Sequence, residues 1–135
     1  MVKPLKKEKK PKIGALIKKL DEVYSLYIRQ KYADFADYVS CVTCGKTAHY
    51  KDGMQNGHYE SRAHKNTRYD DQNCHVQCFR CNIRLKGNYT SYALFLRKTY
   101  GEGILEELRK RSREEKRFTS QELLDLIAHY KNLVV

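Results

Sequence analysis

The chain begins with apolar residues at helical spacing. Between residues 13 and 32, apolar side chains recur every three or four positions, and lysines and acidic residues occupy positions between them. A stripe of this kind places one face of a helix against a core and leaves the other face in water. The pattern predicts an amphipathic helix from Ile13 to about Tyr32.

This helical pattern stops in the middle of the chain. Residues 41–80 have little helical periodicity and contain three glycines, a composition that favours a knuckle, loops and brief strands. A short helix should start near Cys78 and carry Asn82 and Lys86. The pattern therefore separates an irregular middle segment from the helix before it.

Helical periodicity returns over residues 89–135. Asn88 can cap a helix that ends at Gly101, and a second, heavily charged helix follows it. Thr119 and Glu122 have the spacing of a capping box, which predicts the start of a final helix that runs through Leu133. We therefore expect an α+β fold in which amphipathic helices surround the irregular segment.

Two Cys-x-x-Cys pairs give the most specific chemical signal, Cys41 with Cys44 and Cys78 with Cys81. Each pair can direct two thiolates to one point, and four thiolates complete the tetrahedral shell that structural Zn²⁺ prefers. Two disulfides or four unrelated thiols are the alternative, which the doubled spacing and the lack of a secretion signal disfavour. We predict a structural zinc that clamps an inserted motif, with Cys74 as a small core residue.

The charge balance indicates a polyanionic partner. The chain has 27 Lys and Arg against 16 Asp and Glu, a net charge of +11, which favours nucleic acid through phosphate neutralisation. Residues 1–12 should form a flexible basic arm, either a DNA-binding arm or a solubilising tail. No apolar run approaches the roughly 20 residues of a membrane span. We therefore expect a cytoplasmic protein with no membrane partner.

The order His58, Asn73, Asn82 resembles the His-Asn-Asn variant of the HNH nucleases. That resemblance implies a ββα-metal finger, in which two strands, a loop and a helix surround one divalent cation. A closer resemblance, to the NinG/Rap family of lambdoid-phage recombination endonucleases, covers about Cys41 to Glu107. Its motifs here are Gly57-His58-Tyr59, Arg68-Tyr69, Asn73-Cys74-His75-Val76-Gln77-Cys78, Cys81-Asn82 and Lys86-Gly87-Asn88.

The family resemblance implies a nuclease domain over residues 13–135. Within it, residues 13–32 form the N-terminal helix, 41–88 the zinc-bracketed HNH-like core and 89–135 the C-terminal helices. The resemblance also implies an enzyme that cuts branched intermediates such as Holliday junctions and D-loops. Phage or host recombination proteins would then be its partners, and the host cytoplasm its location.

Hydrolysis of a phosphodiester needs an activated water and a cation that stabilises charge on the phosphate. We expect His58 to be the general base, because a neutral imidazole accepts a proton near neutral pH. Asn82 should ligate Mg²⁺ or Mn²⁺ through its amide oxygen. Asn73 should fix the loop and orient His58 rather than touch the metal.

One position departs from the pattern of many relatives. They carry an acidic metal ligand immediately before the catalytic histidine, and this chain has Gly57 there. His75 is the best candidate for the second protein ligand, with Asn56 or Asp70 behind it, or water could fill the position. His75 could alternatively hold the scissile phosphate.

Basic residues outside the cysteine bracket could contact DNA. Lys86 and Arg68 could bind phosphate, and cations in the C-terminal helices could follow the backbone of a duplex arm. For each of them, a solvated cation or an ion-paired helix face is the simpler alternative. The helical candidates are Arg97, Lys98, Arg109 and Arg111.

Three hypotheses for function remain open at this point. The first is a metal-dependent, structure-selective DNA endonuclease with a purely structural zinc. The second is a zinc-stabilised DNA-binding protein without catalysis, acting as an accessory factor in recombination or transcription. The third keeps the nuclease chemistry in a homing or restriction enzyme. A homodimer could form through the apolar faces of the first and last helices, although these faces could equally pack on their own core.

Overall fold

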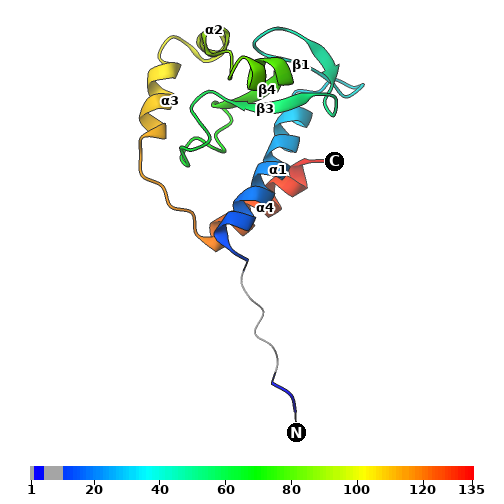
Figure 1. The fold of residues 1–135 in the computed structure, drawn as a ribbon, viewed down its shortest axis with the longest axis vertical. Helices are drawn as coiled ribbons and strands as arrows, with labels where there is room; N and C mark the ends of the chain where they lie inside the picture. The colour runs from blue at the N-terminus through cyan, green and yellow to red at the C-terminus, as the bar shows by residue number, and fades with distance from the viewer. Residues whose placement is uncertain (1, 5–10) are drawn as a thin grey trace.

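The structure is a computed structural model that describes residues 2–4 and 11–135. Most of the expected basic arm, residues 1–12, lies outside the described residues. The rest is a mixture of helices and short strands, so the predicted α+β class is confirmed (Figure 1). In chain order the elements are α1 (Ile13–Lys31), β1 (Tyr38–Ser40), β2 (Thr47–His49), β3 (Met54–His58), β4 (Cys74–Cys78), the π-helical turn η1 (Arg80–Arg84), α2 (Tyr89–Tyr100), α3 (Ile104–Ser112) and α4 (Ser120–Leu133).

The four strands form two separate antiparallel pairs. β1 pairs with β2, and β3 pairs with β4 across the loop of residues 59–73. In the second pair, Gly57 lies opposite His75 and His58 lies opposite Cys74. Because successive side chains of a strand point to opposite faces, this register places His58 and His75 on different faces of the pair.

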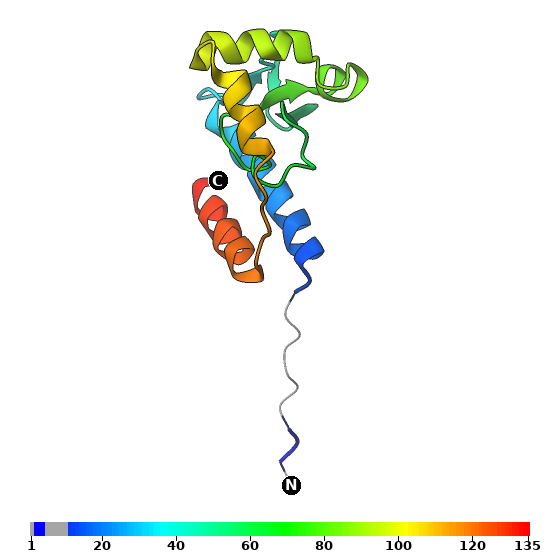
Figure 2. The same cartoon turned by 90° about the vertical axis from the view of Figure 1, so that its left-hand side faces the viewer.

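The β3–β4 pair lies between two helices. α1 covers one face and α2 approaches the other, as the two views show (Figures 1 and 2). Tyr24 and Ile28 of α1 pack with Met54, Cys74 and Val76 of the strands, and all five are buried. A two-stranded pair is only marginally stable by itself, so these helices keep its geometry fixed.

α1 and α4 pack against each other through the apolar stripe that the sequence predicts. Leu16 and Leu20 form a cluster with Leu123 and Ile127, and Phe118 closes its end. The predicted cap is confirmed, because the Glu122 backbone N–H donates to Thr119 Oγ1 at 3.1 Å. The apolar faces considered for a dimer are thus covered within one chain.

The segment after Cys78 differs from the prediction. The expected short helix is a five-residue π-helical turn that carries Asn82 but ends before Lys86. Lys86 has a left-handed backbone, with φ of 51°, which no helical residue adopts. Asn88 precedes α2 as predicted, but its φ of 46° is also left-handed and its side chain does not cap the helix. Instead, Asn88 Nδ2 lies 3.6 Å from Cys81 Sγ.

No helix among the described residues is long and apolar enough to cross a membrane.

Candidate metal centre and active-site pocket

The cysteine cluster joins the first hairpin to the end of the second. Cys41 and Cys44 lie between β1 and β2, Cys78 ends β4 and Cys81 lies in η1. Their sulfur atoms all lie within 4.8 Å of one another, and those of Cys44 and Cys78 are 3.7 Å apart. Tetrahedral zinc with bonds of about 2.3 Å separates its sulfurs by about 3.8 Å. The cluster therefore has the size and donor set that can hold a structural zinc, as the spacing predicts.

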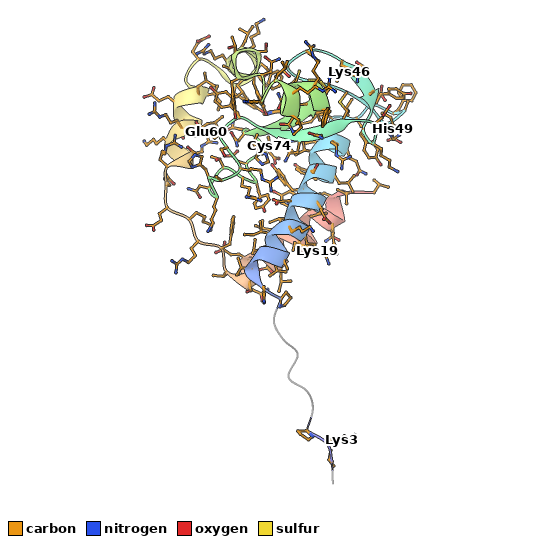
Figure 3. The ribbon with its side chains drawn as sticks, in the orientation of Figure 1. Lys3, Lys19, Lys46, His49, Glu60 and Cys74 are labelled. Carbon is orange, nitrogen blue, oxygen red and sulfur yellow. The ribbon has the colours of Figure 1, made fainter. Side chains whose placement is uncertain are left out.

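Cys74 is separate from this cluster. It lies inside the molecule, where Figure 3 labels it, and its side chain is fully buried. Burial raises the pKa of its thiol well above the ordinary value, with nearby Asp70 and Asp71 adding to the effect. A protonated, buried thiol of this kind behaves as a small apolar side chain, which confirms Cys74 as a core residue.

A pocket of about 440 Å³ brings together residues that are far apart in the sequence. His58, at the end of β3, and Asn82, in η1, both line it. Asn56 lines it from β3 and Arg62 from the β3–β4 loop. Three of these side chains offer nitrogen or oxygen lone pairs, and the fourth is a cation, so the pocket can receive a phosphate with a hydrated metal ion.

His58 is held in one orientation by the backbone of the β3–β4 loop. Its Nε2 atom lies 2.8 Å from the carbonyl oxygen of Arg68. A carbonyl only accepts hydrogen bonds, so Nε2 carries the proton and the lone pair of a neutral ring is on Nδ1. Nδ1 has no hydrogen-bond partner among the described residues. The ring can therefore accept a proton at Nδ1 while Nε2 stays fixed.

The surroundings also keep His58 neutral. Burial lowers the pKa of His58 below its ordinary value, and the Arg68 and Arg62 guanidiniums act in the same direction. The hydrogen bond to the Arg68 carbonyl and the carboxylate of Asp21 oppose this shift without reversing it. A histidine with a lowered pKa is unprotonated at neutral pH, which is the state that a general base requires.

Asn73 organises the loop that holds His58. Its side-chain oxygen accepts from the Glu60 N–H at 2.7 Å, and its Nδ2 donates to the carbonyls of Glu60 and Thr67, each at 3.0 Å. Thr67 immediately precedes Arg68, whose carbonyl holds the His58 ring. Asn73 is buried and does not line the pocket. Its contacts match the predicted role of fixing the loop.

Two amide oxygens remain for a cation. Asn82 donates from Nδ2 to Gln55 Oε1 at 2.8 Å, which fixes the amide plane and leaves Oδ1 available. Asn56 Oδ1 is buried and has no hydrogen-bond partner among the described residues. A buried oxygen without a donor is costly in a folded protein, and a hard cation is one group that would satisfy it. Of the three candidates for the second-ligand position, only Asn56 lines the same pocket as Asn82.

His75 is not in this pocket, which corrects the sequence-based choice. The strand register turns its side chain to the α2 side, where Tyr92 Oη and Tyr100 Oη lie 3.0 and 2.8 Å from its two ring nitrogens. Tyr92 directs its hydroxyl proton to the Gly57 carbonyl, so His75 Nδ1 donates to Tyr92 and Nε2 accepts from Tyr100. Burial lowers the pKa of His75 to about 4. Both nitrogens are occupied, so His75 has no lone pair for a metal or phosphate in this site.

Asp70 is also engaged elsewhere. One of its carboxylate oxygens accepts from Arg111 Nη1 at 3.0 Å, and the other accepts from the Gln72 N–H. Asp70 does not line the pocket with His58.

Arg68 has a structural partner and is not a free phosphate ligand. Its Nε donates to Asp21 of α1 at 2.9 Å, and its side chain is only 14% exposed. Tyr69 also donates to Asp21, at 2.8 Å. These bonds hold the β3–β4 loop on α1 while the Arg68 carbonyl holds His58. Arg68 thus positions the candidate base, which corrects its prediction as a DNA contact.

The other predicted DNA contacts divide into two groups. Lys86, Lys98 and Arg109 are exposed, and Arg97 is exposed with a weak ion pair to Glu102 at 4.0 Å. Arg111 is instead half-buried and bonded to Asp70 and Glu107. The exposed residues remain candidates for phosphate contact, whereas Arg111 joins α3 to the β3–β4 loop.

Gly57 is required by Gln77, a side chain of the paired strand β4 that lies diagonally across from it. Gln77 is fully buried, and its Nε2 donates to the Gly87 carbonyl at 2.8 Å and to Thr43 Oγ1 at 3.2 Å. These bonds direct Gln77 toward Gly57, where any added Cβ would collide with Oε1 and Cδ of Gln77. A side chain at position 57 therefore requires Gln77 to leave the position that these bonds give it.

Several residues that shape this site cannot be identified from sequence patterns. Asp21 occupies the charged stripe of an amphipathic helix, the ordinary pattern for a solvent-facing residue. Gln55 and Gln77 are polar residues of short strands, and only the strand pairing brings them to Asn82 and Gly57. Asn56 could be named as a candidate, but its unpaired buried oxygen is a property of the fold.

The geometry defines a small α+β protein with a four-cysteine cluster that can hold zinc beside a polar pocket. Residues 2–135 match the family model described as NinG: Bacteriophage Lambda NinG protein. The chain therefore belongs to the NinG family, as its motifs suggested. No solved structure matches it.

Relatives in this family come from phages. The chain is 27% identical over 116 residues to Protein ninG of Salmonella phage P22, an alignment that covers 85% of this chain and 54% of that protein. Protein ninG of Escherichia phage lambda is 26% identical over 116 residues, with 85% and 53% covered. The chain thus spans about half the length of these curated relatives.

The cluster predicts different outcomes for two cysteine substitutions. Cys78→Ser should abolish stoichiometric zinc binding and unfold the end of β4, because Cys78 contributes one of four sulfurs. Cys74→Ala should keep its zinc, because Cys74 lies outside the cluster. Metal analysis of purified protein and circular dichroism measure both effects. Full zinc content in the Cys78 variant would contradict the assignment of this ligand.

The packing of Gln77 on Gly57 predicts a thermodynamic coupling. Gly57→Ala should lower the free energy of unfolding by about 1–3 kcal/mol through overpacking, since Gly57 does not have a positive φ that would disfavour alanine. In a Gln77→Ala background the same change should cost much less. Urea unfolding of the four zinc-loaded proteins in a double-mutant cycle measures the coupling. Equal costs in both backgrounds would show that Gln77 does not exclude a side chain at position 57.

Proposed function

We propose that this NinG-family chain is a metal-dependent DNA endonuclease of the HNH type that cuts branched recombination intermediates. The observation that carries the proposal is the state of the His58 ring, which shares one pocket with Asn82 and Asn56. Its Nε2 is held by a hydrogen bond, its lowered pKa keeps it neutral, and its Nδ1 has a lone pair free to accept a proton. The order of elements along the chain is β3, a loop, β4 and a helical turn, which is the order expected of a ββα-metal finger. The preference for branched DNA is taken from the family resemblance.

The chemistry assigned to the pocket is in-line hydrolysis. His58 Nδ1 takes a proton from a water, the resulting hydroxide attacks phosphorus, and the P–O bond opposite the attack breaks. The leaving oxygen then takes a proton from solvent. A bound Mg²⁺ or Mn²⁺ would stabilise the negative charge that develops on the phosphate and leaving oxygen. Asn82 Oδ1 and Asn56 Oδ1 are the proposed protein ligands.

Arg62 completes the proposed site. It lines the pocket and its side chain is largely exposed, so its guanidinium can contact a phosphate oxygen. Its ion pair with Asp21 is 3.6 Å long, and Asp21 has a closer partner in Arg68. Arg62 can therefore move to the substrate without leaving Asp21 unpaired.

Substitution of His58 tests the proposal directly. His58→Ala should reduce cleavage of a labelled four-way junction or D-loop at least about 100-fold, the contribution typical of a general base. Zinc content and junction affinity should stay near those of the parent chain. Gel assays with Mg²⁺ or Mn²⁺, and with linear duplex as a comparison, measure the cleavage.

His129→Ala is the matched control, because His129 is an exposed histidine on α4 and does not line the pocket. It should cut as the parent chain does. If the parent chain binds the junction tightly and cuts it under neither cation, the non-catalytic DNA-binding alternative replaces this proposal. Equal cleavage by the His58 variant would remove His58 from the mechanism.

The lowered pKa of His58 predicts the pH dependence of cleavage. A base with a lowered pKa stays unprotonated further into acid, so activity is lost only as pH falls through that lowered value. The acid limb of the single-turnover rate should therefore have its midpoint below the ordinary histidine pKa of about 6.5. Zinc content must be checked at every pH, because protons compete for the cysteines. A midpoint above about 6.5, with zinc retained, would contradict the neutral, buried environment of the base.

A further inference from the structure

Three exposed apolar side chains lie on the segment that follows the second cysteine pair. Phe79, Ile83 and Leu85 are 46%, 52% and 43% exposed, and we call these three residues the knuckle patch. Phe79 directly precedes η1 and Ile83 is its fourth residue, so their side chains are about one helical turn apart. Apolar residues grouped in this way on a surface are typical of a contact site.

The knuckle patch is continuous with the proposed active site. Ile83 lines the same pocket as His58 and Asn82, and so does Tyr89, a half-exposed aromatic residue at the start of α2. A strand whose phosphate enters the pocket would therefore pass over Ile83. Whatever lies next to the scissile phosphate meets an apolar surface.

The charge around the knuckle patch fits a nucleic acid. Arg80, Arg84 and Lys86 are exposed among its members, and the Arg84 guanidinium lies 5.9 Å from the centre of the Phe79 ring. Residues 72–101 contain no aspartate or glutamate. An apolar surface with Arg80, Arg84 and Lys86 around it combines the two features that bind unpaired nucleotides, an apolar platform for bases and charges for phosphates.

The cysteine cluster would hold this surface rigid. Cys78 and Cys81 bracket Phe79 and Arg80, so a metal bound there fixes the backbone from which the patch projects. Gly87 N–H donates to the Cys81 carbonyl at 2.9 Å and closes the segment on its other side. A rigid apolar surface loses little conformational entropy when it binds.

We infer that the knuckle patch packs against unpaired bases beside the scissile phosphate and thereby selects branched DNA over continuous duplex. The inference rests on the proposed nuclease function and specifies how the same site would choose its substrate. Continuous duplex presents phosphates to Arg80, Arg84 and Lys86 but keeps its base faces stacked and covered. At a branch point, unstacked bases offer the apolar surface that Phe79 and Ile83 can cover.

Equilibrium binding without turnover tests the inference. The zinc-loaded chain is titrated in Ca²⁺ against a four-way junction, a gapped duplex and a continuous duplex of equal length, with 2-aminopurine at the branch point, in the gap or at the matching duplex position. Phe79→Ser and Ile83→Ser should each weaken binding to the two interrupted substrates about tenfold, a loss within the range for one stacked base. Affinity for continuous duplex should change less than about twofold, because the cations remain. The fluorescence change at 2-aminopurine should shrink in both variants.

Two further variants separate stacking from general surface effects. Phe79→Tyr keeps the aromatic face and should keep the preference for interrupted DNA. Leu124→Ser removes a comparably exposed leucine from α4 and should change nothing, since Leu124 is 40% exposed and lies outside the pocket. Zinc content and circular dichroism of every variant should match those of the parent chain.

The outcomes distinguish this inference from the nuclease proposal. If the serine variants keep the preference while the parent chain cuts branched DNA, the knuckle patch is not the selector and the nuclease proposal stands. If the preference depends on the patch but nothing is cut under any cation, the inference about bases stands and the catalytic proposal fails. Loss of self-association or of protein binding in the serine variants, with DNA affinity unchanged, would make the patch a protein contact and overturn the inference.

Discussion

Four sulfur atoms within 4.8 Å of one another connect the β1–β2 hairpin to the end of β4 and to η1. β1 and β2 form a three-residue pair, and β3 and β4 a five-residue pair, and neither length is stable alone. Free thiolates this close repel each other, whereas a bound Zn²⁺ converts them into a shared ligand set worth on the order of 10 kcal/mol. The cluster fixes the end of β4 and the start of η1, and therefore the position of Asn82 relative to His58.

A second set of contacts positions His58 from the other side. Asp21 of α1 holds Arg68, the carbonyl of Arg68 holds the His58 ring, and Asn73 holds the neighbouring Thr67 carbonyl. Burial acts to raise the pKa of Asp21, but hydrogen bonds from Arg68 and Tyr69 bring it below its usual value. The carboxylate thus stays charged, and the candidate base is oriented by residues that never enter the pocket.

Much of the fold follows from local signals that the sequence contains. The stripe from Ile13, the Thr119 cap and Gly101 after α2 each depend on residues within one or two turns, so they predict helices correctly. The cysteine spacing likewise predicts the cluster, because each pair directs two thiolates from one turn. Such signals are read from neighbours in the chain and need no knowledge of tertiary contacts.

The sequence-based predictions fail for residues whose surroundings depend on contacts between segments far apart in the chain. His75 has a ligand's chemistry, but the β3–β4 register turns it toward Tyr92 and Tyr100. Arg68 looks like a phosphate contact until Asp21, 47 residues away, is placed beside it. Gly57 reads as a missing ligand, while the fold gives the physical reason, namely that Gln77 fills the space. In each case a pairing across the chain overrides what the residue type alone suggests.

The most direct test of a zinc cluster that supports a separate cation site is anomalous X-ray scattering from crystals of the zinc-loaded chain soaked in Mn²⁺. The account predicts two separate signals. Zinc should appear among Cys41, Cys44, Cys78 and Cys81, and manganese should appear in the pocket next to Asn82. The manganese signal should also be lost from crystals of an Asn82→Ala variant that keep their zinc. Manganese found only among the four sulfurs, or bound on the α2 side next to His75, would contradict the assignment of this pocket as the catalytic centre.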